Sequence, residues 1–120
     1  FISLNTYVTE SATNDVYWND FDEIKAGLTS ISQKAAALRK QIVITEFGYE
    51  TSDDDLQSKK YRAYTDIFKS TPNVIGWLSW GWDCGYDKNN PTWAAIGGYS
   101  IVRQATGTPR PAYSILVQNK

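Results

Sequence analysis

A carboxylate at the end of a hydrophobic strand pattern is the feature of this sequence best suited to chemistry. The run from Gln41 to Gly48 reads Gln-Ile-Val-Ile-Thr-Glu-Phe-Gly and is almost continuously apolar up to Glu46. Such a run, rich in β-branched residues, is typical of a parallel strand buried on both faces. In parallel α/β folds, ligands and reacting groups gather where the strands end. We therefore expect Glu46 to be a catalytic carboxylate.

The period of two predicts which way this carboxylate points. Alternation places Ile42, Ile44 and Glu46 on one face of the strand and Val43, Thr45 and Phe47 on the other. We expect the Ile42 face to line the interior of a closed sheet and to meet water if the sheet is open.

Aromatic side chains recur at the other expected strand ends. Tyr7, Tyr49, Trp80 and Trp82 lie at or just after such ends. Indole and phenol rings offer a flat apolar face and a polar edge, which suits the C–H faces and hydroxyls of sugars. Tyr7 shares its strand face with Asn5, so it can point inward as Glu46 does. A hydrogen bond from Tyr7 to Glu46 and simple packing of Tyr7 both remain open.

The composition narrows the chemistry further. The 120 residues contain no His and a single cysteine, Cys84, and the net charge is −1. Without His there is no Ser-His-Asp or Cys-His system and no usual zinc site, so we expect no metal and no cofactor. A nearly neutral chain has no electrostatic footprint for nucleic acid or an anionic membrane. The chain also lacks Met and opens on Phe1, so we expect it to be a processed product or a piece of a longer protein.

Helical and strand patterns alternate along the chain. Apolar residues spaced three and four apart predict a helix between Phe21 and Leu38, capped by Asn19 or Asp20. A second helix is expected to start at Ser52 or Asp53 and to end before Pro72, with the acidic run at its start serving as a cap.

The remaining segments complete the pattern. Phe1–Tyr7 and Asn73–Trp80 are expected strands, and Pro111–Val117 an expected helix. The segment between Gly81 and Ser100 is long for a connection, which favours a functional loop.

The order strand, helix, strand, helix, strand, loop, helix predicts an α/β fold with parallel strands. Three strands cannot close a barrel, and a complete (β/α)8 barrel needs on the order of 250 residues. We therefore interpret residues 1–120 as a single partial (β/α)8 TIM barrel made of the last three βα units, strands 6 to 8.

Three motifs resemble the carboxyl-terminal part of clan A retaining glycoside hydrolases, the (β/α)8 group that includes family 5 endoglucanases and mannanases and family 113 mannanases. Ile44-Thr-Glu-Phe-Gly-Tyr49 resembles the strand 7 motif whose Glu is the nucleophile. Leu4-Asn-Thr-Tyr7 is similar to the end of strand 6, whose aromatic residue commonly lies near that nucleophile. Ile75-Gly-Trp-Leu-Ser-Trp80 looks like strand 8, which ends in the Trp that stacks on the sugar at the cleavage site.

The resemblance implies a hydrolase for β-linked glucan or mannan type substrates, with Glu46 as nucleophile. Trp80, Tyr7, Trp82, Tyr49 and Asn5 are the implied substrate-binding residues. Retaining enzymes use two carboxyl groups about 5 Å apart, and the second is an acid/base. The clan's acid/base Glu follows an Asn, and none of the four Glu, namely Glu10, Glu23, Glu46 and Glu50, does so. We expect that residue to come from a missing segment.

Two other interpretations of the chain remain open. It could be a non-catalytic carbohydrate-binding piece, or a half-barrel that acts as an assembly unit. In either case the unpaired edges of the open sheet predict a homodimer or a complementing amino-terminal half-barrel.

Overall fold

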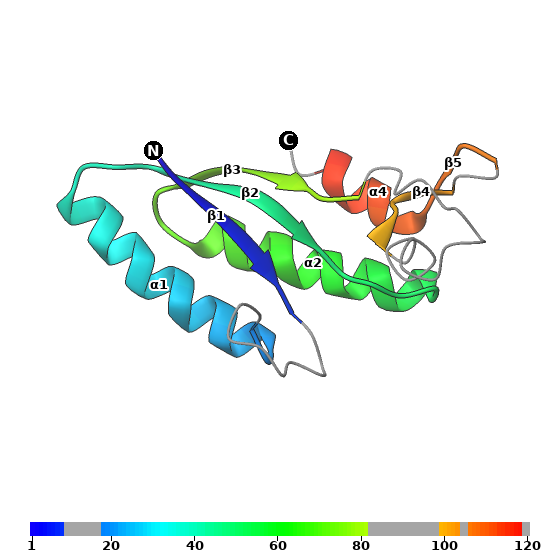
Figure 1. The fold of residues 1–120 in the computed structure, drawn as a ribbon, viewed down its shortest axis with the longest axis horizontal. Coiled ribbons are helices and arrows are strands. Elements are labelled where there is room, and N and C mark those ends of the chain that lie inside the picture. Colours follow the sequence, from blue (N-terminus) through cyan, green and yellow to red (C-terminus); the bar gives the residue numbers. More distant parts are fainter. Residues whose placement is uncertain (9–17, 82–98, 104–105, 119–120) are drawn as a thin grey trace, which may run out of the picture. The chain divides into compact units, whose positions relative to one another are not determined.

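The computed structural model describes residues 1–8, 18–81, 99–103 and 106–118, shown in Figure 1. These residues form two compact units, Phe1–Phe47 with Asp66–Ser79, and Gly48–Thr65 with Trp80–Lys120. Residues 9–17 and nearly all of the expected long loop, including Trp82 and Cys84, lie outside the described residues.

A three-stranded sheet organises the first unit. Its strands are β1 (Ile2–Tyr7), β2 (Ile42–Gly48) and β3 (Val74–Ser79), in the order β1-β2-β3. Strands β2 and β3 pair in parallel, and Figure 1 shows the arrow of β1 pointing the same way as that of β2. The predicted α/β class with parallel strands is therefore confirmed.

Helix α1 (Phe21–Ala37) forms where the apolar spacing predicts it. Asp20 is its N-cap, accepting a hydrogen bond of 2.8 Å from the Glu23 amide. Ile24 and Leu28 are almost completely buried. Trp18 packs directly on Gly27, leaving no room for a Cβ there. The predicted stripe is correct except at its end, because Leu38 at the C-cap is 65% exposed.

The facing of β2 differs from the alternation that the sequence predicts. Ile42 and Ile44 are 0% exposed, so the prediction that they meet water in an open sheet is wrong. The next buried side chain is Phe47, three positions after Ile44, and the pairing with β3 has a register shift between these two residues. An irregularity of this kind reverses the alternation of the following side chains.

Phe47 belongs to an aromatic cluster that covers the helix side of the sheet. Its ring meets Phe68 edge to face with centroids 5.1 Å apart, and Phe68 meets Trp77 at 5.8 Å. Trp77 therefore packs against helix α2 (Asp54–Ser70) through Phe68. Within the described residues the opposite side of the sheet is open, because Ser3 and Asn5 on β1 are exposed and Ile75 and Leu78 on β3 are 57% and 61% exposed.

The second unit contains the first twelve residues of helix α2 (Asp54–Ser70) and all of helix α4 (Pro111–Val117). Asp53 caps α2, because one of its carboxylate oxygens accepts hydrogen bonds of 2.9 Å from the Asp55 and Leu56 amides. This confirms capping as a role for the acidic run. No described helix is long and apolar enough to span a bilayer.

A small antiparallel hairpin precedes α4 and was not predicted. Its strands are β4 (Val102–Arg103) and β5 (Thr108–Pro109). Gly107 adopts a φ of 66°, a left-handed conformation that glycine tolerates without strain. Two-residue strands are too short to leave an alternating pattern in the sequence.

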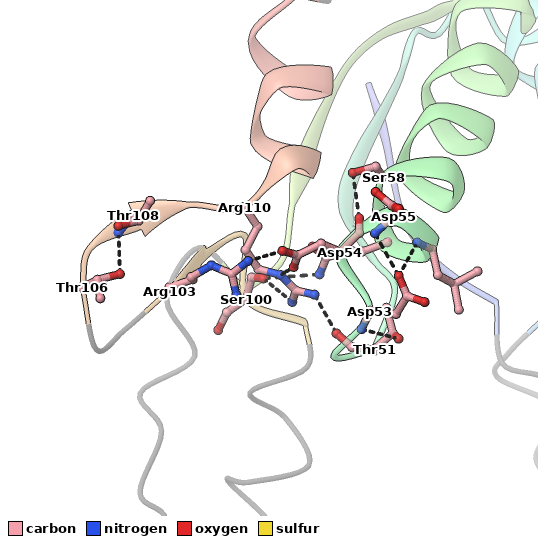
Figure 2. A network of polar contacts seen from close by, with 12 residues as sticks. Thr51, Asp53, Asp54, Asp55, Ser58, Ser100, Arg103, Thr106, Thr108 and Arg110 are labelled. Atoms are coloured by element: carbon pink, nitrogen blue, oxygen red, sulfur yellow. Dashed lines mark hydrogen bonds and ion pairs between the residues drawn. The ribbon is translucent and has the colours of Figure 1, made fainter.

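Arg110 joins the hairpin, α4 and the start of α2 through one buried guanidinium, as Figure 2 shows. Its Nε donates to Asp54 Oδ1 at 2.8 Å. The two terminal nitrogens donate to the carbonyl oxygens of Ser100 at 2.9 Å and Thr51 at 2.8 Å. Arg103 forms a second ion pair with Asp54. A side chain only 6% exposed thus has a partner for each of its nitrogens.

The pKa of Asp54 depends on its burial and on both arginines. Burial raises the pKa of this carboxyl, but the hydrogen bonds and charges of Arg110 and Arg103 outweigh burial and hold it below the ordinary value of 3.8. A carboxyl with a lowered folded pKa stabilises the fold fully above its unfolded pKa, and this contribution is lost as the pH falls through the folded pKa.

We predict that Asp54→Asn lowers the unfolding free energy by about 1–2 kcal/mol at pH 7, because the ion pairs become neutral hydrogen bonds. The difference between parent and variant should be constant above about pH 5 and shrink below about pH 4. Urea unfolding between pH 7 and pH 2 measures both quantities.

Asp66→Asn is the matched control, because Asp66 is exposed on the same helix and has no ion pair within the described residues. A parent-to-Asp54→Asn difference that does not change with pH would contradict the proposed ion-pair contribution.

Candidate active site

Glu46 and Tyr7 form the core of the candidate site. The Tyr7 hydroxyl donates a hydrogen bond of 3.0 Å to Glu46 Oε2, joining the ends of β1 and β2. Of the two possibilities left open for Tyr7, the hydrogen bond is therefore the one observed. Within the described residues Glu46 Oε1 has no hydrogen-bond partner, and the residue is half-buried. The contact fixes one carboxylate oxygen and leaves the other available to a ligand.

The contact also shows which face of the sheet carries Glu46. Tyr7 shares its face of β1 with the exposed residues Asn5 and Ser3, so its side chain lies on the side away from the helices. Glu46 lies on that open face, opposite Ile42 and Ile44. The irregularity in β2 thus brings Glu46 to the open face beside Tyr7, and the alternation predicted to place Glu46 with Ile42 and Ile44 is wrong.

Asn5 and Thr45 form a second polar pair beside the first. The Thr45 hydroxyl lies 2.9 Å from Asn5 Oδ1 and 3.2 Å from the Leu4 carbonyl oxygen, and it donates its proton toward these acceptors. Asn5 is a predicted site residue, but Thr45 was missed. The signal that could have revealed Thr45 is its place immediately before the candidate nucleophile on a strand end.

Trp80 and Tyr49, two of the expected aromatic site residues, belong to the second unit. The half-buried Trp80 ring meets Tyr99 edge to face at 5.3 Å and 83°. Tyr49 is 8% exposed, and the Lys60 ammonium lies 4.9 Å from its ring centroid. In this arrangement a cation covers the Tyr49 ring. Trp82 lies outside the described residues.

Glu50 follows Tyr49 in the second unit and has a perturbed carboxyl. Partial burial raises its pKa above the ordinary value of 4.5. A raised pKa is what a general acid requires near neutral pH. The sequence does not reveal this shift, because partial desolvation of a carboxyl leaves no mark in the sequence.

Metal binding has no visible site in the described part of the chain. No group of three or more His, Cys, Asp or Glu side chains is placed there to hold an ion.

One curated protein matches part of the sequence, whereas no family model matches the chain. Endo-1,4-beta-xylanase B from Cellvibrio japonicus (strain Ueda107) is 31% identical over 99 residues. The match covers 78% of this chain but only 15% of the xylanase.

Solved structures of glycosidases share the fold over nearly the whole chain. A β-glucuronidase from Ruminococcus gnavus matches with a TM-score of 0.70 and 18% identity, over 100% of this chain and 22% of its own. A β-glucuronidase from Faecalibacterium prausnitzii matches with a TM-score of 0.68 and 18% identity, over 97% of this chain and 20% of its own. A triple variant of an endo-beta-1,4-glucanase from Xanthomonas axonopodis pv. citri matches with a TM-score of 0.62 and 15% identity, over 98% of this chain and 35% of its own.

These comparisons relate the chain to glycoside hydrolases through its fold. The chain spans 15% of the xylanase and 20 to 35% of the three solved proteins named above. It thus matches one part of each of these proteins.

The Tyr7–Glu46 contact predicts a measurable coupling. In a double-mutant cycle of Tyr7→Phe and Glu46→Ala, we expect the two changes to be non-additive by about 0.5–1.5 kcal/mol, the usual net value of a partly buried hydrogen bond. Urea unfolding of the four proteins measures it.

Tyr7→Phe combined with Glu23→Ala is the control cycle. Glu23 lies on α1 and accepts its hydrogen bonds from Asn19, so the coupling should be close to zero. Equal coupling in both cycles would remove the specific role of the Tyr7–Glu46 contact.

Proposed function

We propose that this chain carries the nucleophile half of a retaining β-glycoside hydrolase of clan A, as the last three βα units of its (β/α)8 barrel. The observation that carries the proposal is the Tyr7–Glu46 hydrogen bond on the open face of a parallel sheet. The 31% identity to a xylanase and the glycosidase fold support the same assignment.

In the proposed reaction Glu46 Oε1 attacks the anomeric carbon while Tyr7 holds Oε2. The bond from that carbon to the leaving oxygen breaks, and the electron pair moves onto this oxygen, which takes a proton from a second carboxylic acid. Water then hydrolyses the glycosyl ester on Glu46. The acid/base is supplied by a segment other than those described. The pKa of Glu50 is raised, but this residue lacks the preceding Asn of the clan's acid/base.

Aromatic residues would hold the sugar chain. Trp80 is the proposed floor of the cleavage subsite, Trp82 and Tyr49 extend it, and Asn5 supplies a hydrogen bond. Tyr49 contributes least, because Lys60 covers its ring. The substrate is a β-linked glucan or mannan, and the xylanase relative adds xylan to the polymers worth testing.

A test of Glu46 can avoid the missing acid/base. A glycoside with a strongly acidic phenol as leaving group needs no proton donor, and fluorine at carbon 2 slows release of the sugar from the enzyme. We expect 2,4-dinitrophenyl 2-deoxy-2-fluoro-β-glycosides of glucose, mannose or xylose to add one sugar mass to Glu46. Glu46→Gln should slow labelling at least about a thousandfold, because an amide is a poor nucleophile. Intact mass and peptide mapping provide the readout.

Glu23→Gln, at an exposed carboxylate of α1, should label like the parent. Labelling at another carboxylate would overturn the assignment of Glu46. Binding of oligosaccharides without any labelling would favour the non-catalytic carbohydrate-binding alternative.

We also propose that the open sheet associates with a second copy or with the amino-terminal half of the barrel. Strands β1 and β3 are the outer strands of the sheet, and Ile75 and Leu78 on β3 are more than half exposed. Outer strands with exposed apolar side chains recruit further strands.

We expect light scattering at micromolar concentration to give twice the monomer mass. Ile75→Lys with Leu78→Lys should return the chain to a monomer, because charges on an edge strand oppose pairing. Leu38→Lys changes an equally exposed leucine at the end of α1 and should leave the dimer intact. A folded parent monomer would argue against self-association.

A further inference from the structure

Two polar pairs stand side by side on the open face of the sheet, and the reaction proposed above assigns no role to the contact within the second pair. Tyr7 binds Glu46, and Thr45 binds Asn5. The Thr45 hydroxyl has a single proton to donate, and Asn5 Oδ1 at 2.9 Å is a nearer acceptor than the Leu4 carbonyl oxygen at 3.2 Å. Thr45 therefore holds the carbonyl oxygen of the Asn5 amide.

This contact determines what Asn5 offers to a ligand. An amide whose oxygen is engaged presents its NH2 group, which carries two donors and no acceptor. Asn5 is exposed, so these donors can reach a bound molecule. Asn5 and Tyr7 stand on the same face of β1 about 7 Å apart, a span that one sugar ring can cover.

The charge around this face favours neutral sugars. The described side chains beside Glu46, namely those of Tyr7, Asn5 and Thr45, carry no positive charge. The sequence from Phe1 to Ile24 contains no Lys or Arg, and the nearest basic residues to Glu46 in sequence, Arg39 and Lys40, precede β2. Strands β1 and β2 therefore supply no cation to a sugar carboxylate beside Glu46.

We infer that Thr45 and Asn5 form a specificity device for the site proposed above. Thr45 orients the amide so that Asn5 Nδ2 donates to a hydroxyl of the sugar bound over Glu46, and the pair selects neutral pyranosides over uronic acids. This inference rests on the proposed function for the position of the sugar. The orientation of the amide stands independently of it. Thr45 is a positioning residue and Asn5 is the residue that contacts the ligand.

The orientation of the amide can be measured without a ligand. In the parent, relaxation of the side-chain NH2 signals of Asn5 in a nitrogen–proton correlation spectrum should show that this group is rigid on the nanosecond timescale. Thr45→Val removes the hydroxyl while keeping the shape, so the chemical shifts of these signals should change and the NH2 group should become mobile. Thr45→Ser restores the hydroxyl and should restore the signals. Thr29→Val removes a hydroxyl that binds the Lys25 carbonyl on α1, and it should leave the Asn5 signals unchanged.

Ligand selection is tested by titrating the same proteins with methyl β-glucoside, β-mannoside, β-xyloside and β-glucuronide. The parent should bind its best neutral glycoside at least about tenfold more tightly than the glucuronide. Asn5→Asp and Thr45→Val should weaken neutral binding at least about tenfold, whereas Thr45→Ser and Thr29→Val should stay within about twofold.

The outcomes separate this inference from the proposed function. If binding of neutral glycosides depends on Asn5 and Thr45 but Glu46 is not labelled, the specificity device is supported and the assignment of Glu46 as nucleophile is rejected. Labelling of Glu46 with unchanged affinity in Asn5→Asp and Thr45→Val would reject the device and keep the nucleophile. Equal binding of glucoside and glucuronide by the parent would also overturn the inference.

Discussion

The irregularity in β2 between Ile44 and Phe47 is the constraint on which the candidate site depends. Regular alternation would send Glu46 to the face occupied by Ile42 and Ile44, both completely buried. An ionised carboxylate in that apolar layer would cost several kcal/mol unless it found a partner there. The register shift returns Phe47 to the helix side, where it meets Phe68, and leaves Glu46 on the open side beside Tyr7. One local distortion thus serves both the core and the site.

The same distortion explains how the regular strand β1 and the irregular strand β2 form two side-chain contacts on one face. Asn5 and Tyr7 are two positions apart on β1, and because alternation on this strand is regular, they share one face. Their partners on β2, Thr45 and Glu46, are consecutive residues. In a regular strand, consecutive side chains point to opposite faces, and only one of them could contact β1 on the open side. The bulged geometry therefore gives the face two polar pairs where an ideal strand would give one.

Patterns that depend on local physics were readable from the sequence, whereas those that depend on register or distant partners were not. The α1 stripe and the caps at Asp20 and Asp53 were predictable because helix periodicity and capping act within one or two turns. The face of Ile42 was mispredicted, because a bulge in a continuously apolar strand has no compositional signature. Arg110 was missed because its partners lie 10 to 59 positions away in the sequence.

The segment that follows Glu46 has very little freedom to vary. Phe47 is completely buried, and Tyr49 is 8% exposed. Between them, a Cβ on Gly48 would lie 3.0 Å from the Tyr99 ring, closer than side chains ordinarily pack, and in ordinary contact with the Trp80 carbonyl oxygen at 3.5 Å. Directed evolution of this protein would therefore find few folded variants just after the carboxylate. Libraries aimed at new ligands would do better on β1, where Ser3 is exposed and Asn5 is exposed with Thr45 as its described hydrogen-bond partner.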